Sequence, residues 1–156
     1  MSIRLILYQP EIAANLGAIL RISACFGAQV DVVEPCGFPW KTKDISRVAM
    51  DYANVVSPIR HASWEYFEAV YQKREPKRLI LLTTKADLSH TAIRYQPGDH
   101  FIIGQESAGV PEAIHKRADM AVKIAMSPKA RSLNMAVSGA VALSEARRQI
   151  GYDDIP

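Results

Sequence analysis

Polar and glycine residues with the potential for chemistry gather in three short clusters of this sequence. The most informative cluster spans residues 101–111, where an apolar run leads into a turn that is bracketed by Gly104 and Gly109 and carries one carboxylate, Glu106. In open α/β proteins, ligands lie outside the carboxyl ends of strands, and a glycine there lets backbone groups approach a ligand closely. The turn lies about two-thirds of the way along the chain, whereas a dinucleotide-binding fingerprint usually follows the first strand of its unit. We therefore expect a small-molecule site that is built unusually late in the chain.

The second cluster lies near the N-terminus and contains Asn15, Gly17 and Arg21. Apolar residues around it recur at helical spacing, and a glycine inside a helix costs about 1 kcal/mol relative to alanine. Gly17 therefore needs a reason, and two interpretations stay open. Either it lets another element pack closely, with Arg21 as a solvated charge, or it leaves room for a bulky group to reach Arg21.

The third cluster, residues 127–134, connects the last expected strand to the last expected helix. It holds two basic side chains, Lys129 and Arg131, followed by Ser132 and Asn134. Backbone N–H groups and the positive end of the helix dipole suit an anionic or polar ligand at such a place. N-capping of the helix by Ser132 explains the same residues without a ligand, so both interpretations stay open for this cluster taken alone.

The elements that must position these clusters alternate between strand and helix along the chain. Apolar and β-branched runs predict strands at residues 3–8, 29–34, 54–60, 78–83, 100–103 and 120–124. Helical spacing predicts helices at residues 12–26, 44–52, 63–72, 110–117 and 132–150, with Ser63 as an N-cap and Gly27 and Gly151 just beyond two helix ends. The alternation predicts an α/β fold in which helices cover both faces of a parallel sheet. Small residues in the last helix indicate packing on its own sheet, with or without a dimer seam on one face.

Composition sets the outer limits of the interpretation. The chain has 156 residues, of which 49% are hydrophobic and 22% charged, as expected for one soluble domain. Its net charge of +3 permits an RNA or phosphate partner without demanding one. The two cysteines are too few for a disulfide framework and fit a reducing cytoplasm. We expect a cytoplasmic protein without a membrane segment, because no run approaches the ~18 apolar residues that a membrane helix needs.

Other site chemistries lack their motifs. A nucleotide hydrolase needs Gly-x4-Gly-Lys-Ser/Thr, but Gly109 is followed by Val110 and Pro111, and no Gly-x-Gly-x-x-Gly follows a strand. The histidines and cysteines show no ligand spacing, so we expect no metal. A non-catalytic RNA-binding dimer stays open as the alternative from another functional class.

Taken together and in this order, the three clusters resemble the motifs of the SPOUT (α/β-knot) RNA 2′-O-methyltransferases. The patterns that carry the resemblance are Asn15-x-Gly17-x-x-x-Arg21, Gly104-x-Glu106-x-x-Gly109-x-Pro111 and Ser132-Leu133-Asn134-x-Ala136-Val137-Ser138. Further likeness at Leu7-Tyr8-Gln9-Pro10-Glu11-Ile12, Glu34-Pro35-x-Gly37-Phe38 and Leu82-Thr83-Thr84-Lys85 narrows it to a minimal subgroup. That subgroup methylates the wobble nucleotide, a cytidine or modified uridine, of certain leucine tRNAs; another tRNA or rRNA position is the alternative.

The resemblance implies a fold and a cofactor. It implies one SPOUT domain over residues 1–156, in which a parallel sheet is flanked by helices and the C-terminal third forms a deep trefoil knot. The knot and a pocket for S-adenosylmethionine lie in roughly residues 78–150, and the family acts as a homodimer on tRNA. Such threading is among the rare exceptions to the rule that chains are unknotted.

The resemblance also assigns roles to residues. It implies that backbone around Leu82, Gly104 and Ile124, together with Ser132, holds the adenosine part of the cofactor. The residues it implies for the catalytic site are Arg21, Glu106, Ser132, Asn134 and Asn15. A guanidinium stays protonated, so we expect Arg21 to hold a phosphate and stabilise developing alkoxide charge across the dimer interface rather than act as a base.

RNA contacts must come from the methyltransferase body. Lys129 and Arg131, beside the catalytic loop, are the favoured phosphate contacts, and Lys43 belongs to a further basic group. Phe38 and Trp40 either stack on an anticodon base or serve as core packing or a lid. The loop departs from the family at Gln105 and Ala108, where relatives often carry proline and arginine.

Overall fold

The computed structural model describes residues 2–41, 43, 45, 47, 52, 55–73, 77–153 and 155. Its strands are β1 (Arg4–Tyr8), β2 (Gln29–Val33), β3 (Ile59–His61), β4 (Leu79–Leu82), β5 (Leu88–Ser89), β6 (His100–Ile103) and β7 (Met120–Lys123). They form one seven-stranded sheet in the order β3-β2-β1-β6-β4-β7-β5. Every strand pair is parallel, which confirms the predicted α/β architecture.

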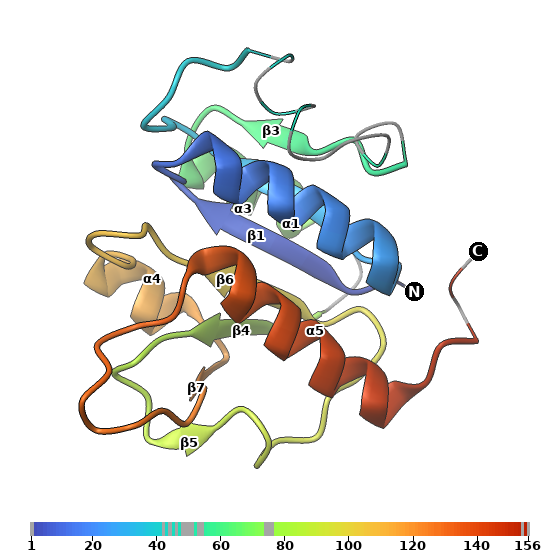
Figure 1. Cartoon of the computed structure of the whole chain (residues 1–156), viewed down its shortest axis with the longest axis vertical. Coiled ribbons are helices and arrows are strands. Elements are labelled where there is room, and N and C mark those ends of the chain that lie inside the picture. The colour runs from blue at the N-terminus through green and yellow to red at the C-terminus, as the bar shows by residue number, and fades with distance from the viewer. Residues whose placement is uncertain are drawn as a thin grey trace.

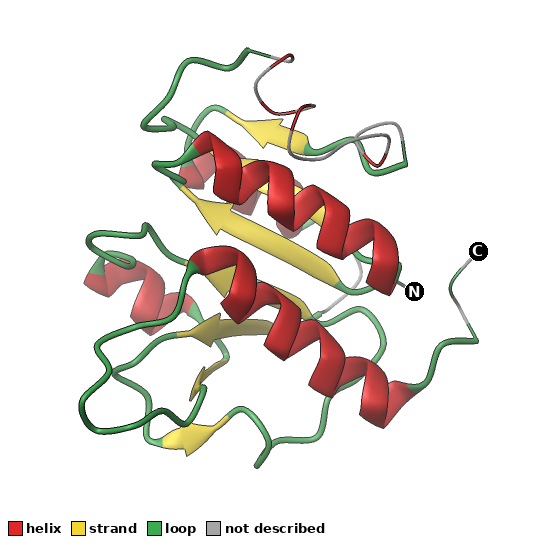
Figure 2. Ribbon diagram, viewed as in Figure 1, coloured by secondary structure: helices red, strands yellow, loops and turns green. Residues whose placement is uncertain are grey.

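Helices cover both faces of this sheet (Figures 1 and 2). They are α1 (Ala13–Phe26), α3 (Trp64–Tyr71), α4 (Glu112–Arg117) and α5 (Met135–Ile150). Along β1, Leu5 and Leu7 pack in the cluster that contains α1 and α5, whereas Ile6 packs in the cluster of α3 and α4. Because side chains of a strand alternate between faces, the apolar run of β1 fills both layers at once. Within the described residues, no helix is long and apolar enough to cross a membrane.

Local signals predicted several element ends correctly. β6 has the predicted bounds, and α1 ends where Gly27 adopts a left-handed conformation with φ of 59°. Ser63 caps α3, since its side chain accepts a hydrogen bond from the backbone N–H of Tyr66. These features depend on residues that are close in sequence, which is why the sequence reveals them.

Other predicted elements differ from the structure. The last helix begins at Met135 rather than at residue 132, and its N-cap is Asn134, whose side chain accepts from the N–H groups of Ala136 and Val137. The strand expected at 54–60 is the shorter β3, and the two-residue strand β5 was not predicted. The helix expected at 44–52 lies largely outside the described residues. The short edge strands lack the long apolar runs that made the central strands easy to predict.

The small residues of α5 pack against its own sheet layer. Gly139, Ala142 and Ala146 lie on the buried side, and a Cβ at Gly139 would come within 2.9 Å of the Cδ1 atom of Ile19 in α1. The packing interpretation of these small residues is therefore confirmed at Gly139. Because it lacks a side chain, α1 and α5 approach closely over the sheet (Figure 1).

Arg147, a fully buried cation in α5, joins the C-terminal ends of the two helices. Its Nε donates to the carbonyl oxygen of Phe26 at 2.8 Å, and its guanidinium also donates to the carbonyl oxygens of Gly27 at 3.1 Å and Gly151 at 3.3 Å. The last carbonyls of a helix have no partner within it, and a cation at this end also complements the helix dipole. Arg147 therefore stabilises the parallel pairing of α1 and α5.

Replacing Arg147 by methionine should lower the free energy of unfolding by about 3 kcal/mol, because buried carbonyls lose hydrogen bonds from a charged donor. Urea unfolding followed by circular dichroism measures the change. The matched control is Arg148→Met, since Arg148 is exposed and pairs with Glu145 on the same helix. Equal losses from the two variants would contradict a special contribution from Arg147.

Candidate active site

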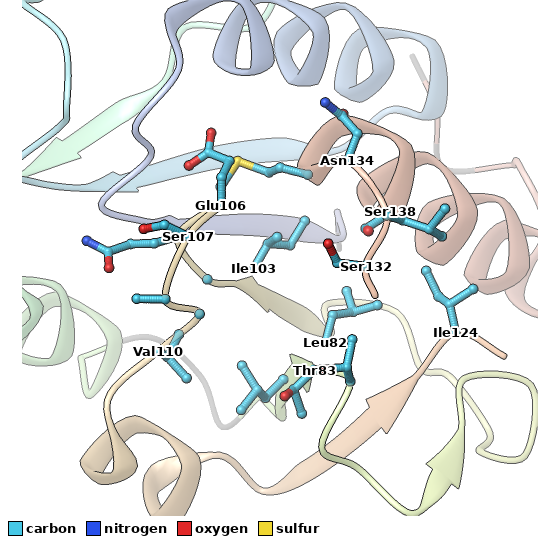
Figure 3. Close-up of a pocket in the computed structure, with 18 of the residues that line it drawn as sticks. Leu82, Thr83, Ile103, Glu106, Ser107, Val110, Ile124, Ser132, Asn134 and Ser138 are labelled. Atoms are coloured by element: carbon cyan, nitrogen blue, oxygen red, sulfur yellow. The ribbon is translucent and has the colours of Figure 1, made fainter. Parts of the chain in front are cut away.

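A cavity of about 530 Å³ opens at the carboxyl ends of β4 and β6 (Figure 3). Its wall is formed mainly by the ends of β4, β6 and β7 with the segments that follow them, and by the start of α5. The lining residues are 81–85, 103–110, Ile124, Met126, 132–135 and Ser138, together with Ile12, Asn15 and His115. This is the edge of a parallel sheet at which ligands bind. All three sequence clusters contribute residues to the wall of this cavity, which is the place where we predicted a small-molecule site.

The glycine-bracketed loop closes on itself at the mouth of β6. Gln105 and Gly109 exchange backbone hydrogen bonds of 2.9 and 3.0 Å, and Gly109 has a positive φ of 66°. A Cβ at Gly104 would lie 2.4 Å from the carbonyl carbon of Gly109. The loop can therefore close in this way only with glycine at position 104. This is a different reason for the glycine than the close approach of a ligand that we expected from the sequence.

Glu106 turns from this loop toward the N-terminus of α1 and away from Leu82 and Ile124 (Figure 3). Its carboxylate accepts hydrogen bonds from the backbone N–H groups of Glu11 at 2.8 Å and Ile12 at 3.3 Å. α1 has no side-chain cap at its own N-cap residue and no acidic residue in its first turn. Glu106 thus supplies, from far along the sequence, the anionic acceptor that a helix N-terminus favours.

A chain of side-chain hydrogen bonds then connects the three sequence clusters. Asn15, which is buried, donates from Nδ2 to Glu106 at 2.9 Å and accepts at Oδ1 from Nδ2 of Asn134 at 2.8 Å. Asn134 in turn accepts from the N–H groups of Ala136 and Val137 at the start of α5. Glu106, Asn15 and Asn134, which we call the relay, were all predicted as site residues. The relay ties the loop to the N-termini of both helices.

Glu11 makes a second connection to the loop, which the sequence did not reveal. Its carboxylate accepts from the backbone N–H and from the hydroxyl of Ser107, both at 2.8 Å. The backbone bond, followed by the hydroxyl bond, lowers the pKa of the Glu11 carboxyl from its ordinary value. Its position just before a helix marks Glu11 as a capping candidate. Only the folded chain shows that its partner is Ser107.

The four residues expected to hold a cofactor all line the cavity. Leu82, Gly104 and Ile124 are half-buried at three strand ends, and Ser132 is exposed at the approach to α5. Thr83, Lys85 and His115 also line the cavity and were not predicted. Apolar walls beside hydroxyl groups can accommodate a ligand with both an apolar part and polar groups.

The remaining predicted residues lie outside the cavity wall. Arg21 is exposed on α1, with its guanidinium 5.7 Å from the ring centre of Tyr52. Lys129, Arg131 and Lys43 are exposed. The structure therefore does not bring Arg21 to the cavity of its own chain.

Phe38 and Trp40 are half-buried and pack against the hydrophobic core. Their rings stack with centres 6.4 Å apart, and the guanidinium of Arg60 lies 4.3 Å from the ring centre of Trp40. These contacts favour the core-packing interpretation of the two aromatic residues over free stacking surfaces for a base.

The parallel sheet defines an α/β protein with a cavity at the carboxyl ends of its strands. The model of the SpoU rRNA Methylase family matches residues 2–144. The chain therefore belongs to this family of methyltransferases, and the resemblance seen in its three motifs is confirmed.

Individual relatives agree with this assignment. A protein of Beijerinckia indica subsp. indica named tRNA (cytidine(34)-2′-O)-methyltransferase is 46% identical over 147 residues, which cover 94% of this chain and 91% of that protein. A solved structure described as giving insights into the 2-OH methylation of C/U34 on tRNA has a TM-score of 0.86 and 33% identity, over 95% of this chain and 90% of that chain. The SpoU methyltransferase AviRb of Streptomyces viridochromogenes, in complex with the cofactor AdoMet, shares the fold, with a TM-score of 0.84 and 24% identity over 95% of this chain and 60% of that chain.

Replacing Gly104 by alanine should lower the free energy of unfolding by about 2 kcal/mol, because the new methyl group overlaps the backbone of Gly109. Thermal or urea unfolding measures this change. The control is Ala108→Ser at an exposed position of the same loop, where we expect a change within about 0.5 kcal/mol. A Gly104→Ala variant as stable as the control would show that the loop closes in another way.

Proposed function

We propose that this chain methylates the ribose 2′-oxygen of the wobble nucleotide of tRNA, with S-adenosylmethionine as methyl donor. The observation that carries the proposal is the meeting of the three motifs at one cavity. It is supported by a 46% identical relative named for action on cytidine 34 of tRNA. The finer substrate that we propose is nucleotide 34, cytidine or modified uridine, of leucine tRNAs.

The cavity suits the proposed methyl donor. Its volume of about 530 Å³ lies within the ~300–1,000 Å³ of small-molecule sites. Backbone at Leu82, Gly104 and Ile124, with the Ser132 hydroxyl, would hold the adenosine part in a bent conformation. Bound there, S-adenosylmethionine would supply a sulfonium methyl group without a metal: the ribose 2′-oxygen would bond to the methyl carbon as the S–C bond breaks in line, S-adenosylhomocysteine would leave, and the 2′-hydroxyl would lose its proton. The complex of AviRb with AdoMet, in the same fold, supports this assignment.

The protein contributes by positioning. The relay of Glu106, Asn15 and Asn134 holds the loop and two helix N-termini in a fixed arrangement. The site therefore loses little conformational entropy when substrates bind. Ser132 lies next to this arrangement in the cavity wall. We assign these residues to ordering the site rather than to proton transfer.

We propose that the chain acts as a homodimer and that Arg21 serves the cavity of the partner protomer. Arg21 is exposed and does not line its own cavity, which is the arrangement that action across an interface requires. Its guanidinium remains charged and can hold a phosphate while stabilising charge that develops on the 2′-oxygen.

The remaining features of the proposal follow from the family. The chain forms one SPOUT domain over residues 1–156, and its C-terminal third, with the cofactor pocket in roughly residues 78–150, is threaded as a deep trefoil knot. Lys129, Arg131 and Lys43 contact the RNA backbone through their charge. The protein acts in the cytoplasm, as bacterial relatives named for tRNA methylation support.

Methylation of total tRNA by the purified protein tests the proposed function. With S-adenosylmethionine present, we expect 2′-O-methylation at nucleotide 34 of leucine tRNAs, mapped by mass spectrometry of nuclease fragments. A modified nucleotide elsewhere in tRNA would contradict the wobble assignment but would still show methyltransferase activity. RNA binding without any transfer would favour a non-catalytic dimer.

Replacing Arg21 by lysine should reduce kcat by about 100-fold and leave binding of the methyl donor unchanged. Lysine keeps the positive charge, but its ammonium group cannot present donors to the reacting oxygen in the geometry of a guanidinium. Single-turnover methylation and calorimetry measure the two effects, with exposed Arg94→Lys as the control. Co-expression of Arg21→Ala with Glu106→Ala chains should restore activity in mixed dimers. Near-normal transfer by Arg21→Lys would argue against a role specific to the guanidinium.

A further inference from the structure

Gln9 and Glu11 form hydrogen bonds to the loop residues Gln105, Glu106 and Ser107. Nε2 of Gln105 donates to Oε1 of Gln9 at 3.0 Å, and Gln9 has a positive φ of 46°, which is unusual for a residue other than glycine. The backbone N–H of Glu11 donates to the Glu106 carboxylate, and the Glu11 carboxylate accepts from the N–H and the hydroxyl of Ser107. These contacts form a ladder between two segments that are far apart in sequence.

Glu11 and Glu106 hold each other's segment through reciprocal hydrogen bonds. The carboxylate of Glu106 accepts the N–H of Glu11, and the carboxylate of Glu11 accepts the N–H of Ser107, the residue after Glu106. The backbone of Glu11 is itself confined, because a Cβ at Gly37 would lie 2.8 Å from the Cα of Glu11. The backbone position from which the Glu11 carboxylate reaches the loop is therefore restricted.

Ser107 belongs to the wall of the cavity, whereas Glu11 does not. Ser107 and Ala108 form the exposed tip of the loop, where few packing contacts restrain the chain. Hydrogen bonds to a charged acceptor are among the stronger ones, so the two bonds to Glu11 restrain Ser107 in addition to the backbone bonds between Gln105 and Gly109 that close the loop. A ligand that binds to an already ordered loop avoids the entropy loss of ordering it.

We propose that Glu11 is a positioning residue of the cofactor site, whose ionised carboxylate fixes Ser107 and thereby preorganises the loop 104–109 for the methyl donor. This inference rests on the proposed function, because it names S-adenosylmethionine as the ligand that the loop receives. Glu11 acts through Ser107, since it does not itself line the cavity.

The test measures binding of S-adenosylmethionine by calorimetry to the wild-type protein, Glu11→Gln, Ser107→Ala and the double variant. Glu11→Gln should raise the Kd about tenfold, the loss that one hydrogen bond to a charged acceptor can cause. Ser107→Ala should weaken binding in the wild-type background but add less than about twofold once Glu11 is changed, since the two side chains act through one contact. In methylation assays, the KM for the donor should rise with little change in kcat at saturation.

Glu65→Gln is the matched control for Glu11→Gln. The Glu65 carboxylate likewise accepts a hydrogen bond from a serine hydroxyl, that of Ser63 at 2.5 Å. This bond is the main cause of the lowered pKa of the Glu65 carboxyl. Glu65 does not line the cavity, so its replacement should leave the Kd unchanged. A Glu11→Gln variant with the wild-type Kd, or with effects that simply add to those of Ser107→Ala, would overturn the inference.

Hydrogen exchange of the free protein separates this inference from the proposed function. Glu11→Gln should speed exchange of the Ser107 amide, because that N–H loses its charged acceptor, whereas Glu65→Gln should not. Failure of the wild-type protein to bind the donor would refute the proposed cofactor. Unchanged exchange at Ser107 would refute the role of Glu11, whichever result the binding experiment gives.

Discussion

The structure depends on how the free N–H groups at two helix N-termini are satisfied. The first turn of a helix leaves backbone donors without internal partners, and α1 supplies no side-chain cap or acid of its own. Glu106 fills this need from 94 residues away at Ile12, and its bond to Asn15 spans 91 residues. Asn15 then reaches Asn134 across 119 residues, where α5 receives its own cap. The residues that complete two helices thus also assemble the wall of the cavity.

The C-terminal ends of the same two helices are joined by hydrogen bonds from a buried arginine. Arg147 satisfies the carbonyl groups at the end of α1 from a buried position in α5. A negative group therefore lies at the N-terminus of α1 and a positive group at its C-terminus, as the helix dipole favours at each end. With both ends tied and Gly139 allowing close contact between them, α1 and α5 form a stiff frame. A stiff frame is what precise positioning of reacting groups requires.

Gln105 and Ala108, where the resemblance predicts departures from the family, have different surroundings in the structure. Gln105 takes part in the ladder by donating to Gln9, so a side chain at this position adds a contact between loop and β1 end. Ala108 is exposed at the loop tip, and the arginine that we expect in relatives would place a cation there. We therefore expect more of the RNA affinity of this chain to come from basic residues outside the loop.

The sequence by itself determined the class of fold, most strands and the region of the site. Alternation of apolar strands with amphipathic helices, the bounds of β6 and the caps at Gly27 and Ser63 all depend on neighbours within a few residues. The motif residues Glu106, Asn15 and Asn134 were identifiable by type and spacing, although their bonds to one another were not.

The tertiary structure alone decided which of these distant residues meet. It paired Glu11 with Ser107 and buried Arg147 against α1. It also left Arg21 outside its own cavity. Hydrogen-bond partners separated by many residues are chosen by how strands and helices pack, and no local pattern encodes that choice.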